Sequence, residues 1–255
     1  MSQLAGKSAV VLGASSKGGI GEAIACLFAE EGAKVTVSGR KVDPLKRLAA
    51  ALDGTAQTCD VTQEADIETL FETAKSKYGS VDIAVNASGV NMPAPISALT
   101  RESLQTLCDV QFIGPTLFIK QAAAAMPDGG SIIALSSVTA ELTGHNLGAY
   151  AATKTAIDKM VKVAALEYGP QAIRVNSLSP SLTSTPMTTK VFETTSMVQA
   201  FEKETPIGRL VTAEDVAFAA LYLANDRCVA TGDNIRVSGG AHLRRLPTYQ
   251  EMMGT

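Results

Sequence analysis

The stretch "VVLGASSKGGIGEAIACLFAEEGAKVTVSGRK" occupies Val10–Lys41 and sets four glycines between two apolar runs. Its beginning, "SAVVLG", predicts a buried strand because it is a short, β-branched apolar run that ends in glycine. "GEAIACLFAEEGA" predicts a helix, because Ile24, Leu27 and Phe28 share one face and Gly32 follows as a C-terminal stop. "KVTVSG" predicts a second strand. The stretch therefore predicts a strand–helix–strand unit with a glycine-rich turn before its helix.

The glycine-rich turn is typical of a phosphate site. The start of a helix presents unpaired N–H groups and the positive end of the helix dipole, and glycine lets a pyrophosphate approach the backbone. Gly13, Gly19 and Gly21 depart from the spacing G-x-G-x-x-G, since five residues separate the first two and one separates the last two. Taken alone, such a run is equally compatible with an ordinary tight turn. The flanking strand–helix–strand pattern favours a bound dinucleotide.

The composition predicts one globular domain over residues 1–255 and excludes several classes of protein. The chain is 46% hydrophobic and 18% charged with a net charge of -3, which permits a full core. No apolar run reaches the ~18 residues of a membrane span, and no basic cluster typical of nucleic-acid binding occurs. The four cysteines form no C-x-x-C pair and the chain has two histidines, so we expect no metal site. Because the start of the chain lacks a secretory signal pattern, we expect reduced thiols and a cytoplasmic location.

Strand and helix patterns continue to alternate along the chain. Further strands are predicted in "TAQTCDV", "VDIAVNAS", "GSIIALSS", "IRVNSLS" and "GDNIRVSGG", with helices between most of them. One long helix is predicted over Arg101–Met126, with a kink at Gly114-Pro115. Seven strands separated mainly by helices predict a Rossmann-type, doubly wound parallel sheet with helices on both faces.

The segment from Pro186 to Pro206 departs from this alternation. It is polar and rich in threonine, with isolated apolar residues that include Met187 and Phe192. Ligands of open α/β sheets bind beyond the carboxyl ends of the strands, and this segment follows such an end. We therefore expect residues 186–206 to form a lid over the substrate.

Ser137, Tyr150 and Lys154 form a candidate catalytic group. Tyr150 and Lys154 are four residues apart at the start of a predicted helix, so they share a face, and Ser137 follows a predicted strand. Tyrosine, with a pKa of ~10, is a poor base, but a neighbouring ammonium favours its phenolate. A serine hydroxyl can hold a substrate oxygen while the proton moves. The spacing Y-x-x-x-K alone is typical of ordinary helix surface, but its position after the serine and the glycine turn favours a proton shuttle.

Together these motifs resemble the short-chain dehydrogenase/reductase family over nearly the whole chain. "GASSKGGIG" resembles the family's glycine turn with two extra residues, "CDV" the pair that contacts adenine, and "VNASG" the N-N-A-G motif. "RVNSLSPSLTSTPM" resembles the stretch that holds the nicotinamide amide. With the charges described below, we expect the dinucleotide to be bound by Gly13, Ser15, Lys17, Gly19, Ile20, Gly21, Arg40, Asp60, Val61, Asn86, Gly89, Tyr150, Lys154, Pro180, Leu182 and Thr185. For the substrate we expect Ser137, His145, Met187 and Phe192.

The chain departs from the family pattern at two positions near this site. Gln111 stands where the family has a catalytic asparagine, one methylene shorter, so the resemblance implies either that Gln111 supports the water relay to Lys154 or that the relay is rebuilt. Ser181 replaces the glycine that follows Pro180 and adds bulk beside the nicotinamide. An exposed loop histidine is the alternative for His145.

The end of the second predicted strand favours NADP over NAD. An acidic residue at this point binds the free ribose hydroxyls and repels a 2′-phosphate. The chain has Gly39 there, followed by Arg40 and Lys41. A guanidinium can bind a phosphate through two hydrogen bonds, and Lys17 offers a second positive charge. NAD remains possible, because an arginine at a strand end can also be merely solvated.

The predicted activity is hydride transfer between NADP(H) and a secondary alcohol or ketone, with Tyr150 as acid and base. One alternative is a non-catalytic dinucleotide-binding protein with a regulatory or scaffold role. Another is an enoyl reductase, which in related folds spaces the tyrosine and lysine more widely. The resemblance further implies a homotetramer, in which the helices of Gln111 and Tyr150 pack against their copies.

Overall fold

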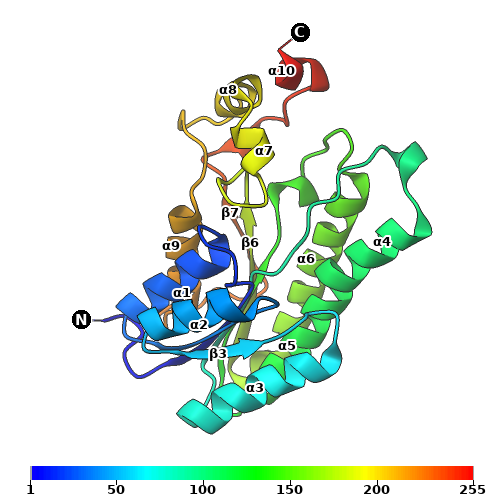
Figure 1. The fold of residues 1–255 in the computed structure, drawn as a ribbon. Helices are drawn as coiled ribbons and strands as arrows, with labels where there is room; N and C mark the ends of the chain where they lie inside the picture. Colours follow the sequence, from blue (N-terminus) through cyan, green and yellow to red (C-terminus); the bar gives the residue numbers. More distant parts are fainter. Residues whose placement is uncertain (1, 255) are drawn as a thin grey trace.

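A computed structural model describes residues 2–254 and contains one parallel sheet. The strands are β1 (Ser8–Leu12), β2 (Lys34–Gly39), β3 (Thr55–Thr58), β4 (Ile83–Asn86), β5 (Gly130–Leu135), β6 (Ile173–Pro180) and β7 (Asn234–Val237). Their order is β3-β2-β1-β4-β5-β6-β7, and every neighbouring pair is parallel. The order reverses between β1 and β4, which opens a crevice beyond their carboxyl ends. The predicted doubly wound sheet of seven strands is confirmed (Figure 1).

Helices cover both faces of the sheet (Figure 1). One layer contains α1 (Ile20–Glu30), α2 (Val42–Ala51) and α9 (Ala213–Ala224), and the other contains α3 (Glu64–Tyr78), α4 (Arg101–Cys108), α5 (Gly114–Ala124) and α6 (Gly148–Tyr168). Successive side chains of a strand point to opposite faces. Accordingly, Val11 of β1 belongs to the core beneath α1 and α9, whereas Val10 belongs to the core beneath α3, α5 and α6.

Two predicted elements differ in detail from the structure. The third strand ends at Thr58 rather than continuing to Val61, because the Asp60 carboxylate accepts hydrogen bonds from the backbone and hydroxyl of Thr62 and turns the chain. The predicted long helix is divided by a π-helical turn at Asp109–Ile113, directly before Gly114. Pro115 has no N–H, so the regular hydrogen-bond ladder cannot pass through this point and the turn widens there.

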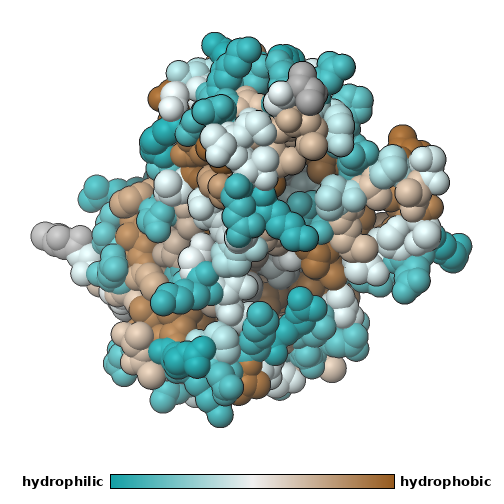
Figure 2. Space-filling view, turned by 45° about the horizontal axis from the view of Figure 1, so that its top comes forward, coloured by the Kyte–Doolittle hydropathy of each residue, from teal (hydrophilic) through white to brown (hydrophobic). Residues whose placement is uncertain are grey.

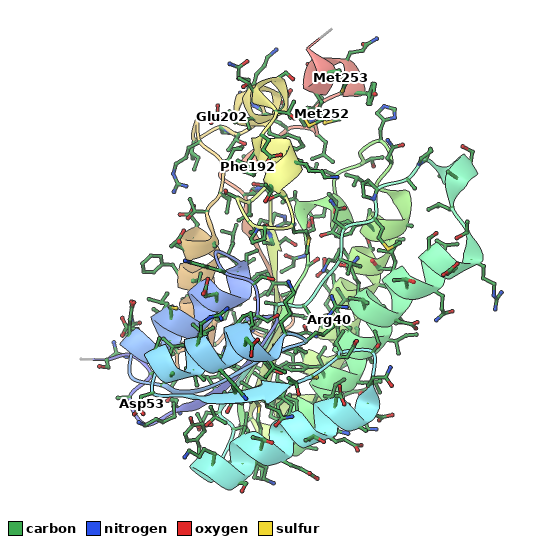
Figure 3. The ribbon with its side chains drawn as sticks, in the orientation of Figure 1. Arg40, Asp53, Phe192, Glu202, Met252 and Met253 are labelled. Atoms are coloured by element: carbon green, nitrogen blue, oxygen red, sulfur yellow. The ribbon has the colours of Figure 1, made fainter. Side chains whose placement is uncertain are left out.

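The segment 186–206 contains two short helices, α7 (Thr189–Phe192) and α8 (Thr195–Lys203), beyond the carboxyl ends of the strands (Figure 1). A further helix, α10 (Tyr249–Met253), was not predicted and packs against α8. The Ser196 hydroxyl donates to the Met252 carbonyl at 2.8 Å, and Met252 lies on α10 beside α8 (Figure 3). Hydrophilic side chains cover the outside of this end of the molecule (Figure 2). Between residues 2 and 254, no helix has the length and apolarity needed to cross a bilayer.

Candidate active site

The glycine turn joins β1, β4 and α1 at very short range. A Cβ atom on Gly13, whose φ is +96°, would lie 2.5 Å from the carbonyl carbon of Ala87, in the segment after β4. A Cβ atom on Gly21 would lie 2.5 Å from the Gly13 carbonyl oxygen. No side chain fits at either position, so the start of α1 sits directly against the crevice. The backbone N–H groups there are available to a phosphate.

The two extra residues of the turn form a bulge on the surface. Lys17 and Gly18 are exposed, and the Gly18 N–H donates to a carboxylate oxygen of Glu22 in the first turn of α1. Gly18 has a φ of +73° with open space around it, so the backbone conformation alone favours glycine there. Lys17 is not among the residues that line the cleft.

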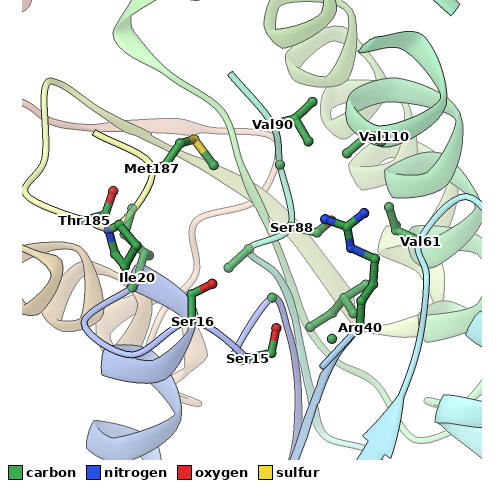
Figure 4. Close-up of a pocket in the computed structure, with 18 of the residues that line it drawn as sticks. Ser15, Ser16, Ile20, Arg40, Val61, Ser88, Val90, Val110, Thr185 and Met187 are labelled. Atoms are coloured by element: carbon green, nitrogen blue, oxygen red, sulfur yellow. The ribbon is translucent and has the colours of Figure 1, made fainter. Parts of the chain in front are cut away.

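A cleft runs along the carboxyl ends of β1, β2 and β4 (Figure 4). Of the residues predicted from the sequence, it brings together Gly13, Ser15, Gly19, Ile20, Gly21, Arg40, Asp60, Val61, Gly89, Thr185 and Met187. Gly39, from the predicted strand end, and Pro186, from the predicted lid, also line the cleft. The lining residues that the sequence did not predict are Leu12, Ser16, Cys59, Ala87, Ser88, Val90 and Val110. Most of these residues are direct sequence neighbours of predicted site residues, so extending each motif by its neighbours would have found them. Arg40 extends across the cleft toward Ser88 and Val61 (Figure 4).

Several predicted residues lie outside the lining of this cleft. Asn86 is buried beneath it, where its side-chain oxygen accepts hydrogen bonds from the backbone and hydroxyl of Ser88 at 3.0 and 2.6 Å. Asn86 therefore positions the segment that follows β4. Pro180 is buried at the end of β6, and Leu182 lines a separate small hollow with Val138 and Phe201.

The predicted substrate residues are spread around the mouth of the site. Met187 lines the cleft and is half exposed. Phe192 lies on α7 (Figure 3) and lines an adjoining hollow with Gly18 and Thr185. His145 is exposed on the segment before α6. The structure therefore places two of these three residues at or beside the cleft, and the substrate role of all three remains a prediction.

Tyr150, Lys154 and Ser137 lie on α6 and directly after β5. Lys154 is only 4% exposed, and its ammonium donates to the carbonyl oxygen of Leu135, the last residue of β5, at 2.8 Å. It also lies 5.7 Å from the centre of the Tyr150 ring. Ser137 in turn is hydrogen-bonded to the Tyr150 phenol, so the three side chains lie close together, and their catalytic role remains a prediction.

Burial shifts the pKa of both ionisable groups. It lowers the pKa of Lys154 to about 8, and the Asp158 carboxylate opposes that change. Burial likewise raises the pKa of the Tyr150 phenol, and a hydrogen bond with Ser137 opposes that change. Each group is thus driven toward its neutral form, while its polar neighbour favours the charged form. Because burial alone disfavours the phenolate, proton transfer by Tyr150 near neutral pH would need the neighbouring positive charge of Lys154.

Gln111 links the cleft to this catalytic group. It lies in the π-helical turn, is 1% exposed, and donates weakly to the Thr153 hydroxyl at 3.4 Å. The Thr153 hydroxyl in turn donates to the Tyr150 carbonyl at 2.8 Å. The other amide atom of Gln111, Oε1, is buried without a partner among residues 2–254 and lies near Gly89. Gln111 therefore contacts the first turn of α6 through Thr153.

Comparisons with known proteins agree with this geometry. A sequence model of the family described as enoyl-(acyl carrier protein) reductase matches residues 13–242. A mitochondrial borneol dehydrogenase of Lavandula x intermedia is 37% identical, over 94% of this chain and 92% of the relative. A 3beta-hydroxysteroid dehydrogenase 1 of Eggerthella lenta is 32% identical, over 97% of each chain. A solved short-chain type dehydrogenase/reductase from Mycobacterium ulcerans is 29% identical and superposes with a TM-score of 0.93 over 98% of this chain and 94% of that one. With the sheet order, the glycine turn and the serine, tyrosine and lysine in place, the chain belongs to the short-chain dehydrogenase/reductase family of oxidoreductases.

Proposed function

We propose that this protein is an NADP(H)-dependent oxidoreductase that interconverts a secondary alcohol and a ketone. The observation that carries the proposal is the buried Lys154 ammonium beside the Tyr150 phenol, one strand away from a cleft with a glycine turn. The cleft fits a dinucleotide, because the glycine turn leaves no space for side chains where a pyrophosphate meets the start of α1. When bound there, the nicotinamide supplies the hydride to the carbonyl carbon or accepts it from the alcohol.

The side chains of the site supply and accept the proton that accompanies hydride transfer. Tyr150 gives its phenolic proton to the ketone oxygen in reduction and takes it back in oxidation. Lys154 stabilises the phenolate by its charge, and its depth in the protein strengthens that interaction. The Ser137 hydroxyl orients the substrate oxygen. General acid and base catalysis of this kind contributes roughly 100- to 10,000-fold to the rate.

Arg40 supports the choice of NADP. It lines the cleft at the end of β2, and no carboxylate between residues 2 and 254 forms an ion pair with it within 4.0 Å. Its guanidinium is therefore available to a 2′-phosphate. A Cβ atom on Gly39 would lie 2.7 Å from the Ser15 hydroxyl, so the site also opposes the acidic side chain that would favour NAD.

For the substrate we propose an alicyclic secondary alcohol or the matching ketone. Val90, Val110 and Met187 add apolar side chains to the lining of the cleft. Two relatives are named for borneol and for a 3β-hydroxysteroid, which both carry the hydroxyl on a saturated ring. Apart from Arg40, no Lys or Arg among the described residues lines the cleft, so no second cation there favours a phosphorylated substrate.

A panel of substrates tests the proposed function. Cyclic alcohols and ketones, linear ones, and a 2-enoyl thioester are each offered with NADP(H) and with NAD(H), and absorbance of the reduced cofactor is followed. We expect turnover of the cyclic alcohols or ketones with NADP(H). Turnover of the thioester alone would assign the protein to C=C reduction, and dinucleotide binding without turnover would support the non-catalytic alternative.

We further propose a homotetramer in the cytoplasm. Large apolar side chains are exposed on the layer of α4, α5 and α6 (Leu104, Ile113, Val163 and Leu166) and on α9 (Phe218 and Tyr222). Two separate apolar faces suit the paired two-fold interfaces of a tetramer. Light scattering at micromolar concentration measures this directly, and a monomeric mass would contradict it.

A further inference from the structure

Asp158 occupies a site of its own behind the catalytic lysine. It lies on α6 one turn beyond Lys154 and two turns beyond Tyr150, so the three side chains follow one face of the helix. Its carboxylate accepts hydrogen bonds from the Ser136 hydroxyl at 2.8 Å, the Ser177 hydroxyl at 2.8 Å and the Asn234 amide at 2.7 Å. These donors come from just after β5, from β6 and from the start of β7. Three neighbouring strands therefore converge on one carboxylate.

Three hydrogen-bond donors favour the charged form of this carboxylate and oppose the effect of its burial. Burial raises the pKa of Asp158, but the hydrogen bonds from Ser177, Ser136 and Asn234 and the charge of Lys154 all oppose that change. None of the three donors carries a charge, so none of them neutralises a negative charge on this carboxylate, which lies in a mostly buried cluster. An uncompensated buried charge is costly, and a partner of opposite sign reduces the cost.

Asp158, one turn away on α6, is the principal charged group that acts on Lys154, and the two act through space rather than as an ion pair within 4.0 Å. Tyr150 lies on the same helix and is neutral over most of the pH range, and Asp158 is the charged group that acts on the lysine. From β7, Arg236 faces the surroundings of Asp158, but its guanidinium is held by Glu141 through two hydrogen bonds, of 2.9 and 2.6 Å. The Lys154 ammonium itself donates to the Leu135 carbonyl, which is neutral.

We propose that Asp158 is a positioning residue of this active site, whose negative charge favours the charged form of the buried Lys154 ammonium beside Tyr150. The inference rests on the proposed function for its role in catalysis. The effect of Asp158 on the pKa of Lys154 needs only the folded chain, without cofactor or substrate. Through Lys154, the cluster of Asp158 with Ser136, Ser177 and Asn234 sets how strongly the phenolate is stabilised.

A purely structural role for Asp158 is the competing explanation, because its hydrogen bonds tie α6 to three strands. The variant Asp158→Asn separates the two. Asparagine has the same shape, and the serine hydroxyls can either donate or accept. The Asn234 side-chain oxygen has no partner among residues 2–254, so it can accept from the new amide. The variant therefore keeps the ties between strands and removes only the charge.

The decisive measurement is the pH dependence of apoprotein stability. Lys154 has a pKa of about 8 in the folded chain and the ordinary value of 10.5 when unfolded. Between these values the unfolded state binds the extra proton, so this lysine makes stability rise with pH from about pH 8. Subtracting the curve of Lys154→Met isolates that rise in thermal unfolding. We expect Asp158→Asn to move the pH at which this rise begins down by about one unit, because the ammonium loses the neighbouring negative charge.

The controls and outcomes separate charge from structure. Asn234→Ala removes one donor but leaves the carboxylate, so its onset should stay close to that of the wild type. If Asp158→Asn does not fold, Asp158→Ser removes the same charge with a smaller side chain. An unchanged onset in the charge-removing variant would overturn the proposal, even if stability falls. Because the measurement uses the apoprotein, a failure of the substrate panel would overturn the proposed function without affecting this result.

A second readout tests the catalytic part of the inference. In the active enzyme, Asp158→Asn should lower kcat near pH 8 by about fivefold, since a one-unit fall in the lysine pKa leaves roughly a tenth of the ammonium groups charged instead of half. The KM for the cofactor should change little. Equal kcat values for Asp158→Asn and the wild type over pH 7–9 would show that the charge does not act on the reaction.

Discussion

The cofactor end and the catalytic end of this site are built on different principles. At the cofactor end, β1, β4 and α1 approach so closely that added Cβ atoms would lie 2.5 Å from neighbouring backbone atoms. There the backbone forms the site, and only residues without a side chain fit at Gly13 and Gly21. At the catalytic end, burial is the main cause of the shifted pKa values of Lys154 and Tyr150, and Asp158 and Ser137 oppose those shifts. The cofactor end therefore depends on glycines, which have no side chain, whereas the catalytic end depends on how deeply its ionisable groups are buried.

The largest expected effect comes from removing the phenol at the catalytic end. Tyr150→Phe keeps the ring and removes the acid and base, so kcat should fall by roughly 100- to 10,000-fold. Cofactor binding should survive, because the cleft lining does not include this side chain. Steady-state kinetics and cofactor titration by fluorescence measure the two quantities. A variant that retains more than about a tenth of the wild-type kcat would refute the acid and base role.

A second test acts on the cofactor end. Gly13→Ala forces a Cβ atom to within 2.5 Å of Ala87 at a φ of +96°, so we expect a loss of roughly 2–5 kcal/mol of stability and much weaker dinucleotide binding. Gly18→Ala is the matched control. Its φ is also positive, at +73°, but open space surrounds it, so only the smaller conformational cost remains. Thermal unfolding of both variants checks this, and equal losses would mean that close packing at Gly13 is unimportant.

The same contrast explains how far the sequence could predict the molecule. Strand and helix positions, the sheet and most of the cleft follow from local patterns, because the glycines and the apolar runs act on their immediate neighbours. The Asp158 cluster was not predicted, because Asp158 and Asn234 lie 76 positions apart and only the folded sheet brings them together. The π-helical turn and α10 were missed for a related reason. The first is a local adjustment before Pro115, and the second is a short helix held by its contacts with α8.

The third test concerns Arg40 at the cofactor end. Among residues 2–254, Arg40 is the one unpaired cation that lines the cleft. A charge-assisted hydrogen bond contributes about 1.5–3 kcal/mol, so the preference for NADP should be on the order of ten- to a hundredfold. Arg40→Ala should lower the ratio of kcat/KM with NADP to kcat/KM with NAD to near one. Lys41→Ala removes the same charge from the next residue, which is outside the cleft lining, and should leave the ratio unchanged. A wild type that prefers NAD, or a ratio that Arg40→Ala does not change, would contradict the NADP assignment.

The smallest expected effect lies where the two ends meet, at Gln111. Its amide reaches Thr153 on the catalytic side and lies near Gly89 on the cofactor side, while Oε1 has no partner among residues 2–254. If this amide replaces the family asparagine, Gln111→Ala should lower kcat by about twofold to tenfold, the value of one hydrogen bond. Gln111→Asn restores an amide and should be tolerated. The fold should persist in both, since Thr153 keeps its bond to the Tyr150 carbonyl. Full and equal activity of the two variants would show that proton transfer to Lys154 does not pass through this side chain, and that the two ends act independently.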